Sequence, residues 1–299
     1  MRIYVTGHKG LLGSACVRRF SANHSIVTSD FDLRHYARLA TFWTTHTPDA
    51  VIHCAARVGG VRANRDNPVG FLSDNLRIQT NVIDMAAACA VQKLVFIGTS
   101  CMFPRDASLP VNEASLLTGP LEASVEAYAI AKIAGWRLCK AYWEQFGKKF
   151  LTVCPSNLYG PRDSYGLDRA HVIPALIHKL HIAKQSKSAF VVWGDGSAVR
   201  EFMHADDCAS AIETVMDKYD SPEPINLGTG VSTTIKELVD MLVDISGFKG
   251  NVVWDTSEPT GIPRKTFSAE KLKALGWKPS IGLREGLEKT WEEFQCQQE

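Results

Sequence analysis

The chain lacks the long apolar run that a membrane-spanning helix requires, since no stretch approaches the roughly 20 apolar residues that cross a bilayer. It also lacks an excess of charge of either sign. The 33 Lys and Arg residues balance 32 Asp and Glu residues, for a net charge of +1. A balanced chain has no electrostatic reason to bind nucleic acid or an anionic membrane. We therefore expect neither as a partner.

Closely spaced cysteines are absent as well: the eight cysteines are scattered, and no two form a C-x-x-C pair. A zinc site needs clustered Cys and His, and His178 and His181 have no thiol or carboxylate nearby in the sequence. The sequence thus predicts no metal site. Reduced thiols are typical of a reducing compartment, and no secretory signal precedes the opening MRIYVTG. We therefore expect a cytoplasmic protein.

No internal repeat or low-complexity linker divides the 299 residues. Short β-branched runs alternate with helical patterns through the first half of the chain. The expected strands are 2–6, 25–28, 50–55, 93–98 and 150–155, and the expected helices are 11–22, 35–46, 68–90 and 124–146. Most of these strands are nearly continuous apolar runs, as in parallel strands covered on both faces. The alternation predicts an α/β fold with a Rossmann-type doubly wound parallel sheet.

Beyond about residue 160 the pattern loosens. Helices are expected at 171–180, 206–218, 234–246 and from 283, and strands at 189–196 and 251–254. The run PINLG at 224–228 is expected to return to the main sheet. We predict a dinucleotide-binding domain over 1–160, completed by that later strand, and a smaller α/β substrate lobe formed mainly by 161–299.

The segment GHKGLLG follows the first expected strand and places glycines at Gly7, Gly10 and Gly13, with Leu11 opening a helix. Glycines there permit a tight turn, close approach of the backbone to a pyrophosphate and close packing of helix on strand. The helix N-terminus then faces the phosphate. The position of the loop between strand and helix predicts a dinucleotide site.

Two residues bear on the choice of dinucleotide. An acidic residue at the end of the second strand bonds the ribose hydroxyl of NAD, and Asp30 lies there. A cation near the ribose favours the phosphate of NADP, and Lys9 stands in the loop. On these residues both cofactors stay open.

The spacing G-x-x-G-x-x-G resembles that of the short-chain dehydrogenase/reductase superfamily, whose extended branch modifies nucleotide sugars. Asp32-Leu33 resembles the superfamily's Asp-hydrophobic pair that contacts the adenine. In YAIAK, Tyr128 and Lys132 are four residues apart and share one helical face. A neighbouring ammonium should lower the pKa of the phenol, which can then exchange a proton with a carbonyl or alcohol oxygen while hydride moves at carbon.

The same superfamily places a hydroxyl residue just beyond the fourth strand to bond the reacting oxygen. The segment GTSCMFP supplies two such residues, Thr99 and Ser100. The spacing to the following aromatic, Phe103, matches Thr99 to this role, and Ser100 is the alternative.

A set of segments spanning nearly the whole chain resembles the GDP-L-fucose synthase family. In order they are GHKG, VGG, TSCMFP, YAIAKIAG, SNLYGP, HVIPAL, VVWGDG, REFMHADD, NLGTGV and PRK. That family acts on GDP-4-keto-6-deoxymannose as a bifunctional 3,5-epimerase and NADPH-dependent 4-reductase. The resemblance therefore implies NADP(H) and a GDP-linked 4-keto-6-deoxyhexose, with NAD not excluded.

The resemblance also implies residue roles. It makes Cys101 and His171 the acid/base pair, and both a thiol and an imidazole can exchange protons near neutral pH. The protons at C3 and C5 flank the C4 ketone, so removing either gives an enolate, whose oxygen Tyr128 and Thr99 would hold.

For substrate binding, the resemblance implies that Asn157 contacts the sugar and that Trp193 packs on the nucleotide. It implies that Lys179, Arg200 and Lys265 face the GDP phosphates, although relatives more often carry Arg where Lys179 stands. Extended members often form homodimers by pairing helices that correspond to 68–90 and 124–146 in a four-helix bundle. We therefore expect a homodimer.

Other functions are less consistent with these residues. A UDP-sugar 4-epimerase needs no acid/base pair at C3 and C5, and a 4,6-dehydratase is expected to carry Asp-Glu where this chain has Ser100-Cys101. A non-catalytic dinucleotide-binding protein typically loses the Tyr or the Lys. The sequence poorly distinguishes an enzyme of the GDP-L-fucose synthase type from an epimerase/reductase of another GDP-4-keto deoxy sugar or of a heptose.

Overall fold

The computed structural model describes residues 1–89, 91–166, 170–257 and 262–297, and its main element is a six-stranded parallel sheet. The strands run in the order β2-β1-β3-β4-β5-β9. Their bounds are β1 (Arg2–Thr6), β2 (Ser25–Val27), β3 (Ala50–His53), β4 (Lys93–Ile97), β5 (Lys149–Pro155) and β9 (Ile225–Leu227). The predicted α/β fold with a doubly wound parallel sheet is confirmed.

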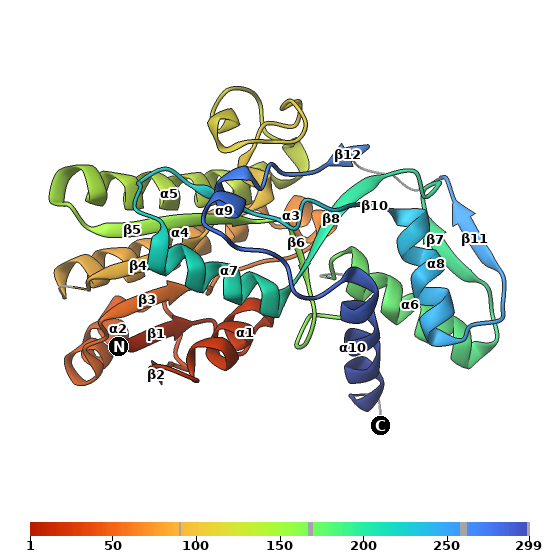
Figure 1. The fold of residues 1–299 in the computed structure, drawn as a ribbon, viewed down its shortest axis with the longest axis horizontal. Helices are drawn as coiled ribbons and strands as arrows, with labels where there is room; N and C mark the ends of the chain where they lie inside the picture. The colour runs from red at the N-terminus through yellow and green to blue at the C-terminus, as the bar shows by residue number, and fades with distance from the viewer. Residues whose placement is uncertain (90, 167–169, 258–261, 298–299) are drawn as a thin grey trace.

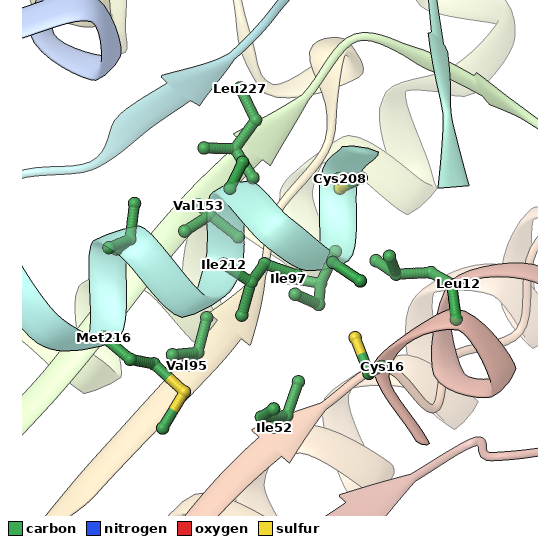
Figure 2. Close-up of a cluster of buried hydrophobic side chains, with 14 of the residues drawn as sticks. Leu12, Cys16, Ile52, Val95, Ile97, Val153, Cys208, Ile212, Met216 and Leu227 are labelled. Atoms are coloured by element: carbon green, nitrogen blue, oxygen red, sulfur yellow. The ribbon is translucent and has the colours of Figure 1, made fainter. Parts of the chain in front are cut away.

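Helices cover both faces of this sheet (Figure 1). One face carries α1 (Leu11–Phe20) and α7 (Ala205–Lys218), and the other carries α2 (Tyr36–His46), α4 (Pro68–Ala88) and α5 (Glu126–Phe146). Figure 2 shows Cys16 of α1 and Ile212 and Met216 of α7 lying over strand residues such as Ile52 and Val95. Burial on both faces explains the continuous apolar strands. The helix expected over 68–90 ends at Ala88, and residue 90 lies outside the described residues.

The strand order reverses at β1, since β2 and β3 lie on opposite sides of it. The connections that leave β1 and β3 therefore diverge, which opens a crevice at the carboxyl ends of the parallel strands. The glycine loop follows β1, and the Thr99 segment follows β4. The topology thus brings both segments to the same edge of the sheet.

A second, smaller lobe has its own core (Figure 1). It contains the parallel pair β7 (Phe190–Trp193) and β11 (Val252–Asp255), with α6 (Val172–Ser186), α8 (Ile235–Ser246) and α10 (Leu283–Cys296). Side chains alternate along β7: Phe190 and Val192 are buried in this core, whereas Val191 and Trp193 are exposed. The two strands therefore cover one side of the lobe.

Four short strands not expected from sequence connect the two lobes: β6 (Asn157–Tyr159), β8 (Val199–His204), β10 (Ser232–Thr234) and β12 (Arg264–Lys265). β8 pairs with each of the other three. Runs of two or three residues carry little periodic signal, and β8 itself contains charged residues. The remaining short elements are α3 (Val61–Asp66), α9 (Glu270–Ala274), η1 (Ser100–Met102), η2 (Glu113–Ser115) and η3 (Ala123–Val125). Among the described residues, no helix has both the length and the apolarity to cross a membrane.

Candidate active site

The glycine loop between β1 and α1 depends on the small size of its residues. Gly7 has φ +68°, and a Cβ there would lie 2.8 Å from the backbone nitrogen of Ala55. A Cβ on Gly13 would lie 2.1 Å from the carbonyl oxygen of Gly7, so helix and loop touch directly. Gly10, by contrast, has room for a Cβ. No side chain of a described residue caps α1, which begins at Leu11. Its first amides are therefore available to an anion, as a dinucleotide site requires.

Lys9 and Asp30, which favoured different cofactors, lie against each other. The Lys9 ammonium is 2.7 Å from the Asp30 carboxylate, and His8 is 3.4 Å from the same oxygen. Hydrogen bonding to Lys9 lowers the pKa of Asp30. Both side chains are largely exposed, so the pair is solvent-screened and weak. Lys9 therefore stays available to a phosphate that competes with Asp30.

Asp32 belongs to an ion-pair chain that the sequence did not reveal. Arg34 lies 2.6 Å from Asp32 and 2.7 Å from Asp74, and Arg57 lies 2.8 Å from Asp74. The hydrogen bond from Arg34 lowers the pKa of Asp32 to about 2, so this carboxyl is ionised. Leu33 is buried beside it in the core under α2 and α4. The chain of charges joins the end of β2 to the segment after β3.

The segment after β4 brings three predicted residues together. The Cys101 amide donates to Thr99 Oγ1 at 3.3 Å at the start of η1. Tyr128, on α5, shares a hydrogen bond with Thr99 and lies within electrostatic reach of Cys101. Thr99 is therefore a hydroxyl whose hydrogen bond lowers the pKa of Tyr128, and its choice over Ser100 as the catalytic hydroxyl stays a prediction. The phenol, the hydroxyl and the thiol form one cluster at the carboxyl edge of the sheet.

The pKa of Tyr128 differs from the sequence expectation. We expected the nearby ammonium to lower it, but burial raises it well above its usual value, and Cys101 adds to the rise. The hydrogen bond with Thr99 opposes this shift without cancelling it. Desolvation penalises the phenolate more than a lysine four residues away stabilises it. Tyr128 is therefore a protonated donor in this structure.

The side chain of Lys132 is buried, with only 2% of its surface exposed. Its ammonium donates to the Ile97 carbonyl oxygen at 2.8 Å and lies 4.7 Å from the centre of the Phe96 ring. Burial lowers the pKa of Lys132 to about 8. The ammonium thus remains charged at neutral pH and anchors α5 to the end of β4.

His171 occupies the N-cap position of α6, a helix of the second lobe. Its side chain is solvent-exposed, yet desolvation by the surrounding protein lowers its pKa. The imidazole is therefore neutral at neutral pH and can accept a proton. Within the described part of the chain, no hydrogen bond joins His171 to the Tyr128 cluster. The two lie on separate elements, α6 and the β4–η1 segment.

Three predicted substrate residues converge on β8. Lys265 of β12 is the register partner of Arg200, and Asn157 of β6 is the partner of Phe202. The Asn157 amide donates to the Glu201 carbonyl oxygen at 2.9 Å. Burial lowers the pKa of both Arg200 and Lys265, and Lys265 lies within electrostatic reach of Cys101. Lys265 and Cys101 are thus close enough to interact electrostatically.

Lys179 of α6 and Trp193 of β7 form a second group in the smaller lobe. The Lys179 ammonium lies 4.2 Å from the centre of the Trp193 ring, a cation–π contact. Trp193 is 48% exposed and so is not a core residue. Its open ring face can stack on a planar group. Among the described residues, no group of three or more His, Cys, Asp or Glu side chains is arranged to hold a metal ion.

Both the sequence and the fold of the chain are similar to those of known proteins. The model of the NAD dependent epimerase/dehydratase family matches residues 3–228. The chain is 44% identical to probable GDP-L-fucose synthase 1 of Oryza sativa subsp. japonica, over 97% of this chain and 90% of that protein. It is 43% identical to the GDP-L-fucose synthase of Sinorhizobium fredii, over 98% of this chain and 95% of that protein. A GDP-L-fucose synthetase from Naegleria fowleri, solved bound to NADP, superposes with a TM-score of 0.92 at 30% identity, covering 99% and 94% of the two chains.

Proposed function

The chain belongs to the NAD dependent epimerase/dehydratase family, and we propose that it is an NADPH-dependent 3,5-epimerase/4-reductase converting GDP-4-keto-6-deoxy-D-mannose to GDP-L-fucose. The observation that carries this proposal is the cluster of Thr99, Cys101 and Tyr128 beside the cationic strand pair of Arg200 and Lys265. Full-length similarity to GDP-L-fucose synthases supports the same conclusion.

Epimerisation requires a proton to leave C3 or C5 on one face of the sugar and a proton to return on the other. We assign these transfers to Cys101 and His171. The neutral imidazole of His171 can accept a proton, and the Cys101 thiol can donate one. The electron pair left at carbon moves onto the C4 oxygen, where the Thr99 hydroxyl and the Tyr128 phenol stabilise the enolate by hydrogen bonding. Reprotonation at carbon restores the ketone with inverted configuration.

Reduction then needs a proton donor at the C4 oxygen. NADPH, when bound, supplies the hydride to C4. Tyr128 gives its phenolic proton to the resulting alkoxide, and its raised pKa keeps that proton in place until the alkoxide forms. The ammonium of Lys132 beneath the site would favour the phenolate that remains.

The glycine loop and α1 fit the cofactor that we assign. Gly7, Gly10, Leu11 and Gly13 would hold the pyrophosphate, and Lys9 would pair with the 2′-phosphate of NADP(H). Asp32 and Leu33 would contact the adenine. For the substrate, Arg200, Lys265 and Lys179 would bind the diphosphate, Asn157 the sugar and Trp193 the nucleotide.

The first test of this function is proton NMR of GDP-4-keto-6-deoxymannose in D2O with the protein and no reduced cofactor. We expect deuterium to enter at C3 and C5, followed by reduction when NADPH is added. NADPH consumption without prior exchange would indicate a simple 4-keto reductase. If the protein causes neither deuterium exchange nor NADPH consumption, this sugar is not its substrate.

We also propose a homodimer formed through α4 and α5. These helices lie side by side on the outer face of the sheet (Figure 1), and Val69 and Ile130 on them are exposed. Light scattering should therefore give twice the mass of the chain, and a monomer would contradict the proposal.

We place the protein in the cytoplasm, which the eight unpaired cysteines support because structural disulfides are rare there.

A further inference from the structure

Glu201 of β8 is a buried carboxylate to which the reaction scheme gives no role. Only 1% of its surface is exposed. Its Oε1 accepts from the Gly230 amide at 3.0 Å, and its Oε2 accepts from the Phe267 amide at 3.0 Å. Burial raises its pKa, while the bonds from Phe267, Gly230 and Thr229 oppose the rise. A buried carboxylate of this kind is retained only where its hydrogen bonds offset the cost of desolvation.

The amides that Glu201 accepts come from two distant segments. Gly230 lies in the loop that connects β9 of the main sheet to β10, and Phe267 follows β12. Since Glu201 sits on β8, its carboxylate ties together three parts of the chain that are separate in sequence. Gly228 is packed so closely that a Cβ there would lie 2.3 Å from Oε1. The carboxylate therefore has one available position.

Two of these segments carry a proposed substrate residue, and one of the two also leads to the catalytic cluster. Arg200 precedes Glu201 on β8, and Lys265 lies two residues before Phe267 and pairs with Arg200. Asn157 bonds the backbone oxygen of Glu201 itself. Phe267 packs against Phe103, with 5.4 Å between ring centres, two residues after Cys101. Glu201 on β8 thus bonds the segment after β12, and that segment in turn packs on Phe103, near Cys101.

We propose that Glu201 is a positioning residue that holds Arg200 and Lys265 in one surface for the GDP-sugar, through its bonds to the Gly230 and Phe267 amides. The proposal rests on the proposed function. Without the carboxylate, the Phe267 amide loses its bond to β8, and only the two-residue pairing of β12 with β8 holds the Lys265 ammonium beside the Arg200 guanidinium. Two cations must be fixed together for both to engage one diphosphate.

Glu201→Gln tests the role with little change of shape. The glutamine keeps one acceptor oxygen but presents an NH2 group to one of the two backbone amides. Both of these groups are donors, so no hydrogen bond forms between them. Gly228→Ala provides a second variant, because its Cβ displaces the carboxylate without changing any charge. The matched control is Glu113→Gln. Glu113 is another buried carboxylate that accepts a backbone amide, from Asn226 at 2.9 Å, and it has no proposed role in binding.

The experiment is calorimetric titration of the full chain with GDP and, separately, with NADPH, together with steady-state kinetics on the GDP-sugar. We expect Glu201→Gln and Gly228→Ala to weaken GDP binding by about tenfold, because the two cations are no longer held in position before GDP binds. The KM for the GDP-sugar should rise similarly, kcat should fall less than threefold, and NADPH affinity should be unchanged. Glu113→Gln should lower thermal stability but keep wild-type GDP affinity.

Two contrary results are distinguishable. Wild-type GDP affinity in both Glu201→Gln and Gly228→Ala would overturn the positioning role and leave the proposed function intact. Equal losses of GDP affinity in Glu201→Gln and the Glu113→Gln control would also overturn it, because general loosening of the fold would then explain both. A wild-type chain that binds no GDP would instead overturn the proposed function.

Discussion

Among the eight thiols of the chain, Cys101 is distinguished by its neighbours. It lies after β4, its amide bonds Thr99, and it is within electrostatic reach of both Tyr128 and Lys265. Cys16, Cys139, Cys154 and Cys208, by comparison, are buried in hydrophobic cores. A buried thiol in such a core acts as a small hydrophobic side chain. These neighbours are why we propose Cys101 as the thiol that exchanges protons with the substrate.

Cys101→Ser should slow deuterium exchange into the substrate by about 10²–10⁴-fold, the usual contribution of a general acid–base group. A serine hydroxyl is far less acidic than a thiol, so proton return at carbon is impaired. The exchange is followed by NMR in D2O. Cys296→Ser, at an exposed thiol of α10, is the control and should keep the wild-type rate. Full exchange in Cys101→Ser would mean that the thiol is structural.

Tyr128→Phe should reduce hydride transfer by about 10²–10⁴-fold while NADPH still binds, because the alkoxide loses its proton donor. The measurement is NADPH oxidation at 340 nm with the keto sugar. Tyr142→Phe is a matched control on the same helix, since its hydroxyl bonds Asp84 at 2.8 Å and not the Thr99 segment. A Tyr128→Phe enzyme with the wild-type rate would require another donor.

At the scale of single elements, the loop between β1 and α1 shows that its three glycines are not equivalent. Gly13→Ala should destabilise the fold by about 1–3 kcal/mol, because its Cβ would overlap the Gly7 carbonyl. NADPH affinity should fall with it, since the loop must move. Gly10→Ala should cost at most about 1 kcal/mol, the difference between Gly and Ala at an N-cap.

Thermal melts and NADPH titrations of the two glycine variants measure these effects. If Gly13→Ala melts like the wild type, helix and loop have room to separate, and the close packing drawn from Gly13 would be wrong. If Gly10→Ala is the more destabilised of the two, the N-cap position matters more than the helix–loop contact.

At the scale of the whole molecule, the segment that leaves β6 packs on α10 through a pair of carboxyl groups. Burial raises the pKa of Asp163 to about 7, and Glu293 of α10 adds to the rise. The Arg162 amide donates to Glu293 at 3.3 Å. A carboxyl with a raised pKa in the folded state binds a proton that the unfolded chain has lost. Asp163 therefore makes the fold less stable as the pH rises from about 4 to about 7.

Asp163→Asn removes this titration and should raise the melting temperature at pH 8 by about 2 °C or more, with little change near pH 4. Differential scanning calorimetry across that range measures it. Asp195→Asn, which removes an exposed carboxylate whose pKa is lowered by Ser197, should give no such gain at pH 8. A gain of equal size at pH 4 and pH 8 would show that the effect is not a titration of Asp163.

Much of the fold followed from local patterns. The apolar strands β1, β3, β4 and β5, the glycine loop and the four-residue spacing of Tyr128 and Lys132 are each visible within a short stretch of sequence. They are predictable because burial on both faces of a sheet, a helix packed against a loop and a shared helical face each demand particular residues at short separations.

What the tertiary structure alone decided depends on contacts between distant residues. The sequence left Lys9 and Asp30 as opposing signals, and the fold pairs them. Only the fold shows that burial raises the pKa of Tyr128, and only it joins Arg200, Lys265 and Phe267 around Glu201. Two-residue strands have no periodicity to detect, and desolvation depends on everything packed around a group. The sequence by itself therefore determined the fold class and suggested the residues of the proposed site, and three-dimensional packing decided their partners and their proton affinities.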